Sequence, residues 1–140
     1  AAHAVATVNG TAALHASLML AGVRAGDEVI VPALAFVGTA NAAVHLGAVP
    51  HFADCDEKTL GLDAAKLESR LNDIAGTGGG ECLNKETGRR IAARLSYVDF
   101  AGDTYMTISA SNTDSPPRFF TSTVTGSSAF LPGSTVGTVA

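Results

Sequence analysis

The stretch of sequence that decides the fold runs from residue 28 to residue 53 and reads EVIVPALAFVGTANAAVHLGAVPHFA. It opens with a mainly apolar, β-like run, Glu28 to Val31, that Pro32 closes, and it ends with a second β-like run, Val49 to Ala53. Short runs of this kind, bounded by proline and glycine, are typical of buried strands. Two strands separated by a helical pattern indicate a parallel βαβ unit.

The helical pattern between the two strands rests on three apolar residues at helical spacing: Val37, Ala40 and Val44. This spacing predicts that the three residues share one buried face of a helix. Gly47 is expected to end the helix, because glycine readily adopts the left-handed conformation of a helix C-terminus.

The same alternation continues toward the N-terminus. Ala4 to Val8 is a strand candidate, and Asn9 or Thr11 can cap the helix that follows it. The apolar positions of that helix are Leu14, Leu18 and Ala21. Gly22 supplies its C-terminal stop.

Toward the C-terminus, Asp63 can cap a third helix. Its apolar stripe consists of Leu67, Leu71 and Ile74. Residues 4–74 are therefore predicted to be α/β. The glycine-rich residues 76–80 are expected to form a loop rather than a dinucleotide-binding turn, which needs a strand before it and a helix after it. Ile91 to Phe100 is predicted to be a further strand.

The last part of the chain has a different composition. More than half of residues 107–140 are Ser, Thr, Gly or Pro, and no helical or strand period persists. Val124, Val136 and Val139 are compatible with a short hairpin, but the composition favours an irregular tail. The sequence thus predicts an α/β part at residues 1–106 and an irregular tail at residues 107–140.

The composition argues against several classes of function. The formal net charge is −4 and no basic stripe is present, so we expect no nucleic-acid partner. Cys55, Cys82 and the four histidines do not fall at metal-ligand spacing, and we expect no metal. Two thiols without a secretion signal fit a cytoplasmic protein. No apolar run reaches the ~20 residues of a membrane span, so we expect no membrane contact.

The junction Asn9-Gly10-Thr11-Ala12 is the clearest chemical signal. The first turn of a helix has free backbone N–H groups and a positive dipole end, and both favour an anion. Gly10 lets the backbone approach a phosphate closely, and Thr11 adds a hydroxyl donor. An ordinary turn with a cap is the alternative interpretation of the same residues.

Four ordered motifs surround and include this junction. They are Val8-Asn9-Gly10-Thr11-Ala12-Ala13-Leu14-His15, Gly26-Asp27-Glu28-Val29-Ile30-Val31-Pro32, Phe36-Val37-Gly38-Thr39-Ala40-Asn41-Ala42, and Gly47-Ala48-Val49-Pro50 with Phe52-Ala53-Asp54. Together they resemble the DegT/DnrJ/StrS family of pyridoxal-phosphate-dependent nucleotide-sugar aminotransferases across residues 4–74. Residues 82–91 are similar to the branch that acts in legionaminic-acid-type sugar biosynthesis. No resemblance is seen after about Met106.

The resemblance implies a fold, a cofactor and partners. It implies a partial large domain of the aspartate-aminotransferase-like (type I) fold, with a mostly parallel sheet and flanking helices. It implies pyridoxal 5′-phosphate as cofactor, a keto-sugar nucleotide substrate, glutamate as amino donor and a homodimer. The cofactor-binding residues that it implies are Gly10, Thr11, Ala12 and Phe36.

Phe36 has two possible roles. The resemblance implies that its ring stacks on the cofactor's pyridine ring, and an aromatic residue just past a strand end would line the same crevice as the phosphate loop. Core packing at a strand–helix corner is the alternative. Thr39 and Asn41 either face the sugar or serve as polar residues of the first helical turn.

The residues that would carry out catalysis are not recognisable. A pyridoxal-phosphate enzyme needs a lysine that bonds to the cofactor and a carboxylate against the pyridinium nitrogen. Asp63-Ala64-Ala65 beside Lys66 looks like the family's acidic motif, but Asp63 is explained as a helix cap. Lys58 and Lys85 lie in polar loops. No catalytic residue is assigned, and whether the chain is an enzyme is left open.

Two interpretations follow. In the first, the chain is an N-terminal fragment of a sugar aminotransferase, inactive as it stands. In the second, it is a non-catalytic α/β fragment with a vestigial phosphate-binding loop. A nucleotide-binding βαβ domain is disfavoured because Pro32, not an acidic residue, ends the second strand. The family's N-terminal arm would lie ahead of Ala1, and the loss of pattern near Met106 fits a tail translated out of frame.

Overall fold

A computed structural model of the chain describes the backbone of residues 5–100, 103–111, 119–127 and 138–139, and the side chains of residues 5–95. The elements in chain order are α1 (Gly10–Leu20), β1 (Glu28–Pro32), α2 (Gly38–His45), β2 (Val49–Ala53), α3 (Ala64–Ile74), β3 (Ala75–Gly78), β4 (Glu81–Asn84), β5 (Ile91–Phe100), β6 (Asp103–Ser111), β7 (Phe119–Ser127) and β8 (Thr138–Val139).

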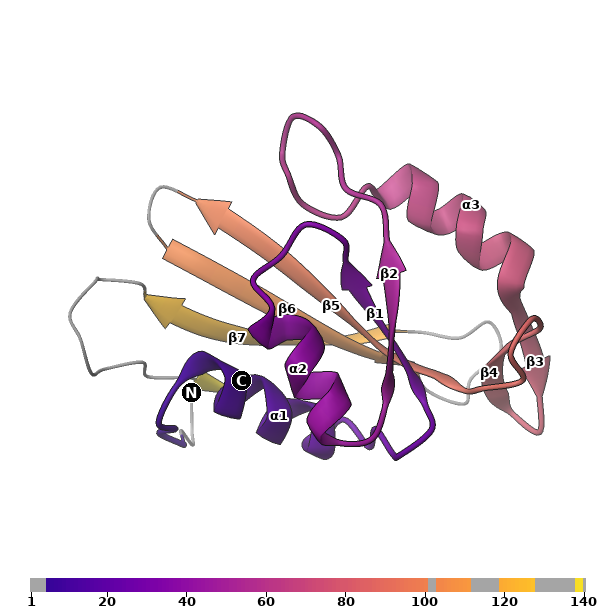
Figure 1. Cartoon of the computed structure of the whole chain (residues 1–140), viewed down its shortest axis with the longest axis horizontal. Helices are drawn as coiled ribbons and strands as arrows, with labels where there is room; N and C mark the ends of the chain where they lie inside the picture. Colours follow the sequence, from indigo (N-terminus) through magenta and orange to yellow (C-terminus); the bar gives the residue numbers. More distant parts are fainter. Residues whose placement is uncertain (1–4, 101–102, 112–118, 128–137, 140) are drawn as a thin grey trace.

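The centre of the fold is a six-stranded sheet in the order β2-β1-β5-β6-β7-β8 (Figure 1). β1 pairs in parallel with β2 on one side and with β5 on the other. The remaining pairs, β5-β6, β6-β7 and β7-β8, are antiparallel. The βαβ unit predicted from residues 28–53 is thus confirmed as the parallel part of an α/β fold.

β1 holds the core together because all five of its residues are buried. Val29 and Val31 face α1 and α2, and with Leu14, Leu18, Ala42 and Ala43 they form one apolar cluster. Ile30 points to the opposite face and packs with Leu67, Ile74 and Ile91. The alternation of side chains along a strand therefore places α1 and α2 on one face of the sheet and α3 on the other (Figure 1).

Most of the predicted elements are confirmed. The strands at residues 49–53 and 91–100 have the predicted bounds, and the strand at residues 28–31 extends by one residue to Pro32. Asp63 caps α3, since its Oδ1 accepts a hydrogen bond of 3.0 Å from the backbone N–H of Lys66. In the predicted stripe of α3, Leu67 and Ile74 are buried and Leu71 is half-buried.

Two expectations about the N-terminal half are wrong. Residues 5–8, the described part of the first strand candidate, form no strand, because no neighbouring strand supplies the hydrogen bonds that would hold them. The predicted face of α2 is also wrong, since Val37 is 61% and Val44 53% exposed. The helix packs instead through Ala42 and Ala43, whose small side chains allow close approach to α1 and β1.

The glycine-rich segment is a hairpin rather than the predicted loop. β3 pairs with β4 in antiparallel register from Ala75↔Asn84 to Gly78↔Glu81. The turn residues Gly79 and Gly80 have φ values of 62° and 83°. Two consecutive positive φ angles match a two-residue turn whose twist suits a hairpin, and glycine reaches them without a steric penalty.

The C-terminal segment also differs from the predicted irregular tail. β6 extends across Met106, and β7 and β8 lie within residues 107–140. β6 follows β5 directly in antiparallel register, from Phe100↔Asp103 to Ala93↔Ala110. Threonine is frequent in these strands, and its β-branched side chain favours extended backbone. A division into residues 1–106 and 107–140 stays a prediction.

Side-chain hydrogen bonds hold the amino-terminal end of β1 in place. Arg90 donates hydrogen bonds to the carboxylate of Asp27, which raises the pKa of the guanidinium, and to the carbonyl oxygen of Gly22. Glu28 is 2% exposed and accepts hydrogen bonds from Asn84 Nδ2 at 2.8 Å and Thr87 Oγ1 at 2.6 Å. A buried carboxylate needs such partners, and here these hydrogen bonds link the β3-β4 hairpin and the turn after it to β1.

None of the helices in the described part of the chain combines the length and apolar character that a membrane crossing requires.

Helix α1 offers a direct test of this packing. Leu18 is fully buried, whereas Leu20, two residues further on, is 77% exposed. We expect Leu18→Ala to lower the free energy of unfolding by about 3 kcal/mol, because it leaves a cavity in the core. Leu20→Ala is the matched control, with a change within about 0.5 kcal/mol. Urea denaturation measures both, and equal losses would contradict the orientation of α1.

Candidate functional site

The predicted phosphate loop lies at the N-terminus of α1. Asn9 is the N-cap, and its Oδ1 accepts a hydrogen bond of 2.8 Å from the backbone N–H of Ala12. Among the described residues, the backbone N–H groups of Gly10 and Thr11 have no acceptor. The protein's own cap therefore occupies the Ala12 N–H, while the two preceding N–H groups and the Thr11 hydroxyl remain for an anion.

The predicted residues from the two helices meet at Gly38, the first residue of α2. A Cβ atom added to Gly38 would lie 2.5 Å from Thr11 Oγ1 and 3.1 Å from Cδ1 of the Phe36 ring. Thr11 and Phe36, 25 residues apart in sequence, are therefore neighbours across this glycine. The fold brings the beginning of α1 together with the loop that leaves the carboxyl end of β1, which is where ligands bind in open α/β sheets.

The Phe36 ring is available for stacking. Phe36 is 74% exposed, so its ring is not part of either apolar cluster of the described residues. This exposure disfavours the alternative that Phe36 packs in the core. Its role toward a cofactor stays a prediction.

Space for a ligand is also present at Gly10. A Cβ atom added there would meet no atom within 4 Å. An anion approaching the first turn of α1 thus finds no side chain in its way. The residues present fit a phosphate group at this position.

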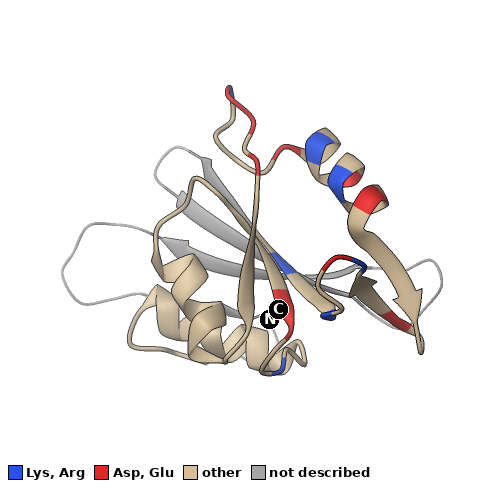
Figure 2. Cartoon of the chain, turned by 45° about the vertical axis from the view of Figure 1, so that its right-hand side comes forward, with Lys and Arg blue, Asp and Glu red and all other residues tan. Residues whose placement is uncertain are grey.

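The electrostatics of the site come from the backbone. α1 and α2 contain no Asp, Glu, Lys or Arg, and Figure 2 shows both helices without charged residues. Figure 2 shows charged residues on α3 and the loops next to it, and also at the start of β1 and on the sheet. The positive end of the α1 dipole, about half an elementary charge, is the attraction that the described residues offer to an anion.

The residues that look like the family's acidic motif, Asp63-Ala64-Ala65 beside Lys66, have a structural role at the start of α3. Asp63 caps the helix, and Lys66 Nζ donates a hydrogen bond of 2.6 Å to Asp54 Oδ2. This hydrogen bond raises the pKa of Lys66 and lowers that of Asp54. A lysine held in its protonated form is a poor nucleophile. Lys66 also belongs to α3, which covers the face of the sheet opposite α1 and α2.

The alternatives for the first turn of α2 are partly resolved. Thr39 is only 2% exposed and therefore serves the packing of the helix, whereas Asn41 is exposed. Gly38 was not recognised from the sequence as part of the site. The signal was present, since a glycine directly after Phe36-Val37 at a helix start permits close approach of a neighbouring element. Within the described residues, no group of three or more His, Cys, Asp and Glu residues is placed to hold a metal ion.

The fold and the site define a class of protein, an α/β protein whose first helix begins, in the described part of the chain, with free backbone N–H groups beside an exposed aromatic ring. Residues 1–75 match the model of the DegT/DnrJ/EryC1/StrS aminotransferase family. Because the match spans more than half of the chain, the protein belongs to this family.

Individual relatives are sugar aminotransferases or associated with polysaccharide synthesis. The chain is 51% identical to GDP-perosamine synthase of Caulobacter vibrioides over 69 residues. The aligned region covers 49% of this chain and 19% of that protein. It is 52% identical over 71 residues to the spore coat polysaccharide biosynthesis protein SpsC of Bacillus subtilis, which covers 51% of this chain and 18% of that protein. The chain thus spans less than a fifth of the length of these two relatives.

Among solved structures, the chain is similar to a DegT DnrJ EryC1 StrS aminotransferase from Brucella abortus. The two are 35% identical, with a TM-score of 0.48, and the match covers 51% of this chain and 19% of that one.

The contact at Gly38 can be tested by substitution. Gly38→Ala is expected to cost about 1–3 kcal/mol of stability, because the new methyl group overlaps Thr11 Oγ1. Combining it with Thr11→Ala should recover most of that loss. Gly10→Ala is the control, since open space surrounds Gly10, and it should not destabilise the protein. Thermal unfolding of these three variants and of the Thr11→Ala single variant measures the coupling, and simple additivity would contradict the contact.

Proposed function

We propose that the chain is part of a pyridoxal-phosphate-dependent aminotransferase that converts a keto-sugar nucleotide into an amino sugar with glutamate as donor. The observation that carries the proposal is the meeting of Thr11, Gly38 and Phe36 at the N-terminus of α1, in a chain that belongs to a sugar aminotransferase family. The identity of the relatives supports the substrate class, because two of them are GDP-perosamine synthases.

Each residue of the proposed site has a defined task toward the cofactor. The N–H groups of Gly10 and Thr11 and the Thr11 hydroxyl bind the phosphate, and Phe36 stacks on the pyridine ring. Ala12 contributes through its place in the first turn, while its N–H stays with Asn9. When bound, the cofactor supplies the electron sink that transamination requires.

For this chain we propose that it binds the cofactor but does not catalyse transamination. Its three lysines are Lys58, Lys66 and Lys85. Lys66 is paired with Asp54, and Lys85 Nζ donates to the carbonyl oxygen of Asp73. Neither contact joins a lysine to the Thr11–Phe36 site. A homodimer, as in the family, and a cytoplasmic location, from the two free cysteines, complete the proposal.

The second candidate is a non-catalytic α/β fragment with a vestigial phosphate loop. Its support is the cap itself, since Asn9 satisfies the Ala12 N–H without any ligand. The two candidates differ in whether the Phe36 ring takes part in binding.

Ligand binding at α1 separates the two candidates. We expect phosphate and pyridoxal phosphate to bind with a dissociation constant in roughly the millimolar range, about 4 kcal/mol. Gly10→Val should abolish binding of both ligands, because its side chain fills the space through which the anion approaches. Phe36→Ala should weaken pyridoxal phosphate and leave inorganic phosphate unchanged. Titrations followed by phosphorus NMR measure both ligands, and an equal response to Phe36→Ala would favour the vestigial loop.

Turnover is the second test. We expect no 2-oxoglutarate to form from glutamate and a keto-sugar nucleotide, because the described residues bring no lysine to the site. Activity that survives replacement of all three lysines by alanine would overturn this account. Activity that is lost in Lys66→Ala alone would identify Lys66 as the lysine that serves the cofactor.

A further inference from the structure

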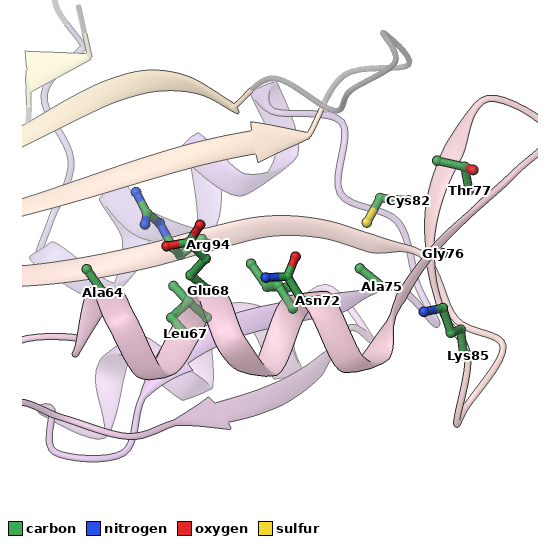
Figure 3. A pocket seen from close by; sticks show the side chains of 11 residues that line it. Ala64, Leu67, Glu68, Asn72, Ala75, Gly76, Thr77, Cys82, Lys85 and Arg94 are labelled. Atoms are coloured by element: carbon green, nitrogen blue, oxygen red, sulfur yellow. The ribbon is translucent and has the colours of Figure 1, made fainter.

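A cavity of about 780 Å³ lies on the face of the sheet opposite the proposed cofactor site. One side of α3 forms its wall, the β3-β4 hairpin closes one end, and Arg94 of β5 contributes from the sheet (Figure 3). Its volume falls within the roughly 300–1,000 Å³ that is usual for sites of small organic ligands. Neither the family match nor the proposed function assigns a role to it.

The cavity combines an apolar wall with a cationic group. Leu67 and Leu71 line it from α3, spaced so that they share one side of the helix. Arg94 lies beside Ile30 in the parallel pairing of β1 and β5, on the face that α3 covers. Cys82, also in the wall, is 5% exposed, and burial raises the pKa of its thiol, so that it stays neutral.

Arg94 has an unsatisfied hydrogen-bond donor among the described residues. Its Nε atom is buried and has no hydrogen-bond acceptor, and no ion pair joins Arg94 to a carboxylate of the described residues. Glu68 lines the cavity from α3, yet it forms no ion pair with Arg94. A buried guanidinium donor without an acceptor is costly, and a bound anion would relieve that cost.

The neighbouring polar groups restrict which anion fits. Lys85 Nζ already donates to the carbonyl oxygen of Asp73, and Glu68 adds one negative charge to the wall. A multiply charged phosphate would therefore be repelled by Glu68 and would leave the leucine wall uncovered. A single carboxylate attached to an apolar body satisfies both the guanidinium and the leucines.

We propose that the cavity between α3, the β3-β4 hairpin and β5 is a binding site for a small organic monocarboxylate, with the carboxylate on Arg94 and the apolar body on Leu67 and Leu71. The site is separate from the one at Thr11 and Phe36, so its existence does not depend on aminotransferase activity.

The test compares 2-naphthoate with its neutral analogue 2-naphthamide on the full chain. Naphthoate is expected to bind at least about tenfold more tightly than naphthamide, the effect of one charge-assisted hydrogen bond. Arg94→Gln should reduce that ratio to near one. Arg89→Gln is the matched control, because Arg89 is exposed, does not line the cavity, and should leave the ratio unchanged.

A filling variant tests the location without removing a charge. Asn72 is an exposed residue of α3 that lines the cavity, and Asn72→Trp should abolish binding of both ligands while circular dichroism stays unchanged. Equal binding of naphthoate and naphthamide to the unaltered chain would overturn the proposal, as would unchanged binding to Asn72→Trp. A loss in Arg89→Gln as large as that in Arg94→Gln would show a nonspecific charge effect and would also overturn it. If Arg94→Gln fails to fold, the comparison of naphthoate with naphthamide on the unaltered chain and the Asn72→Trp variant remain decisive.

Discussion

The burial of β1 on both faces is the constraint on which the rest of the structure depends. A strand whose five residues are all buried needs hydrogen-bonding neighbours on both edges and helices on both faces. β2 and β5 meet the first need through parallel pairing. α1 and α2 meet the second on the side of Val29 and Val31, and α3 meets it on the side of Ile30. The proposed cofactor site and the cavity under α3 lie on opposite faces of the sheet because of this arrangement.

Local signals predicted the parallel half of the fold well. The β-branched run ended by Pro32, the glycine at position 47 and the Asp63 cap each act within a few residues, and each element was found where these signals placed it. The buried face of α2 was not predictable in the same way. In a helix of eight residues, Val37-Ala40-Val44 and Thr39-Ala42-Ala43 are both compatible with helical spacing, and only the close approach of α1 selects the second set.

The sequence predicted the candidate residues of the site but not their arrangement in space. Gly10, Thr11 and Phe36 are recognisable from motifs, whereas the meeting of Thr11 and Phe36 at Gly38 depends on how two helices pack. That the Asn9 side chain takes the Ala12 N–H and leaves those of Gly10 and Thr11 without an acceptor among the described residues also appears only in three dimensions. The strands after residue 100 show a similar limit. Their serine- and threonine-rich sequences carry little periodicity, and the residues between β5 and β6 gave no recognised turn signal for the antiparallel hairpin that the two strands form.

Side-chain hydrogen bonds influence where the protein can tolerate amino-acid substitutions. They join Asp27 to Arg90, and Glu28 to Asn84 and Thr87. These buried contacts sit where β1 begins, so strand register is fixed at one rim of the sheet. At the opposite rim, close packing against Thr11 restricts position 38, whereas Phe36 is exposed. Exposed positions at that rim can change while the order of the strands stays the same. The contacts that hold the strands in register and the exposed residues at the other rim are thus separate, so the exposed residues can change without altering the fold.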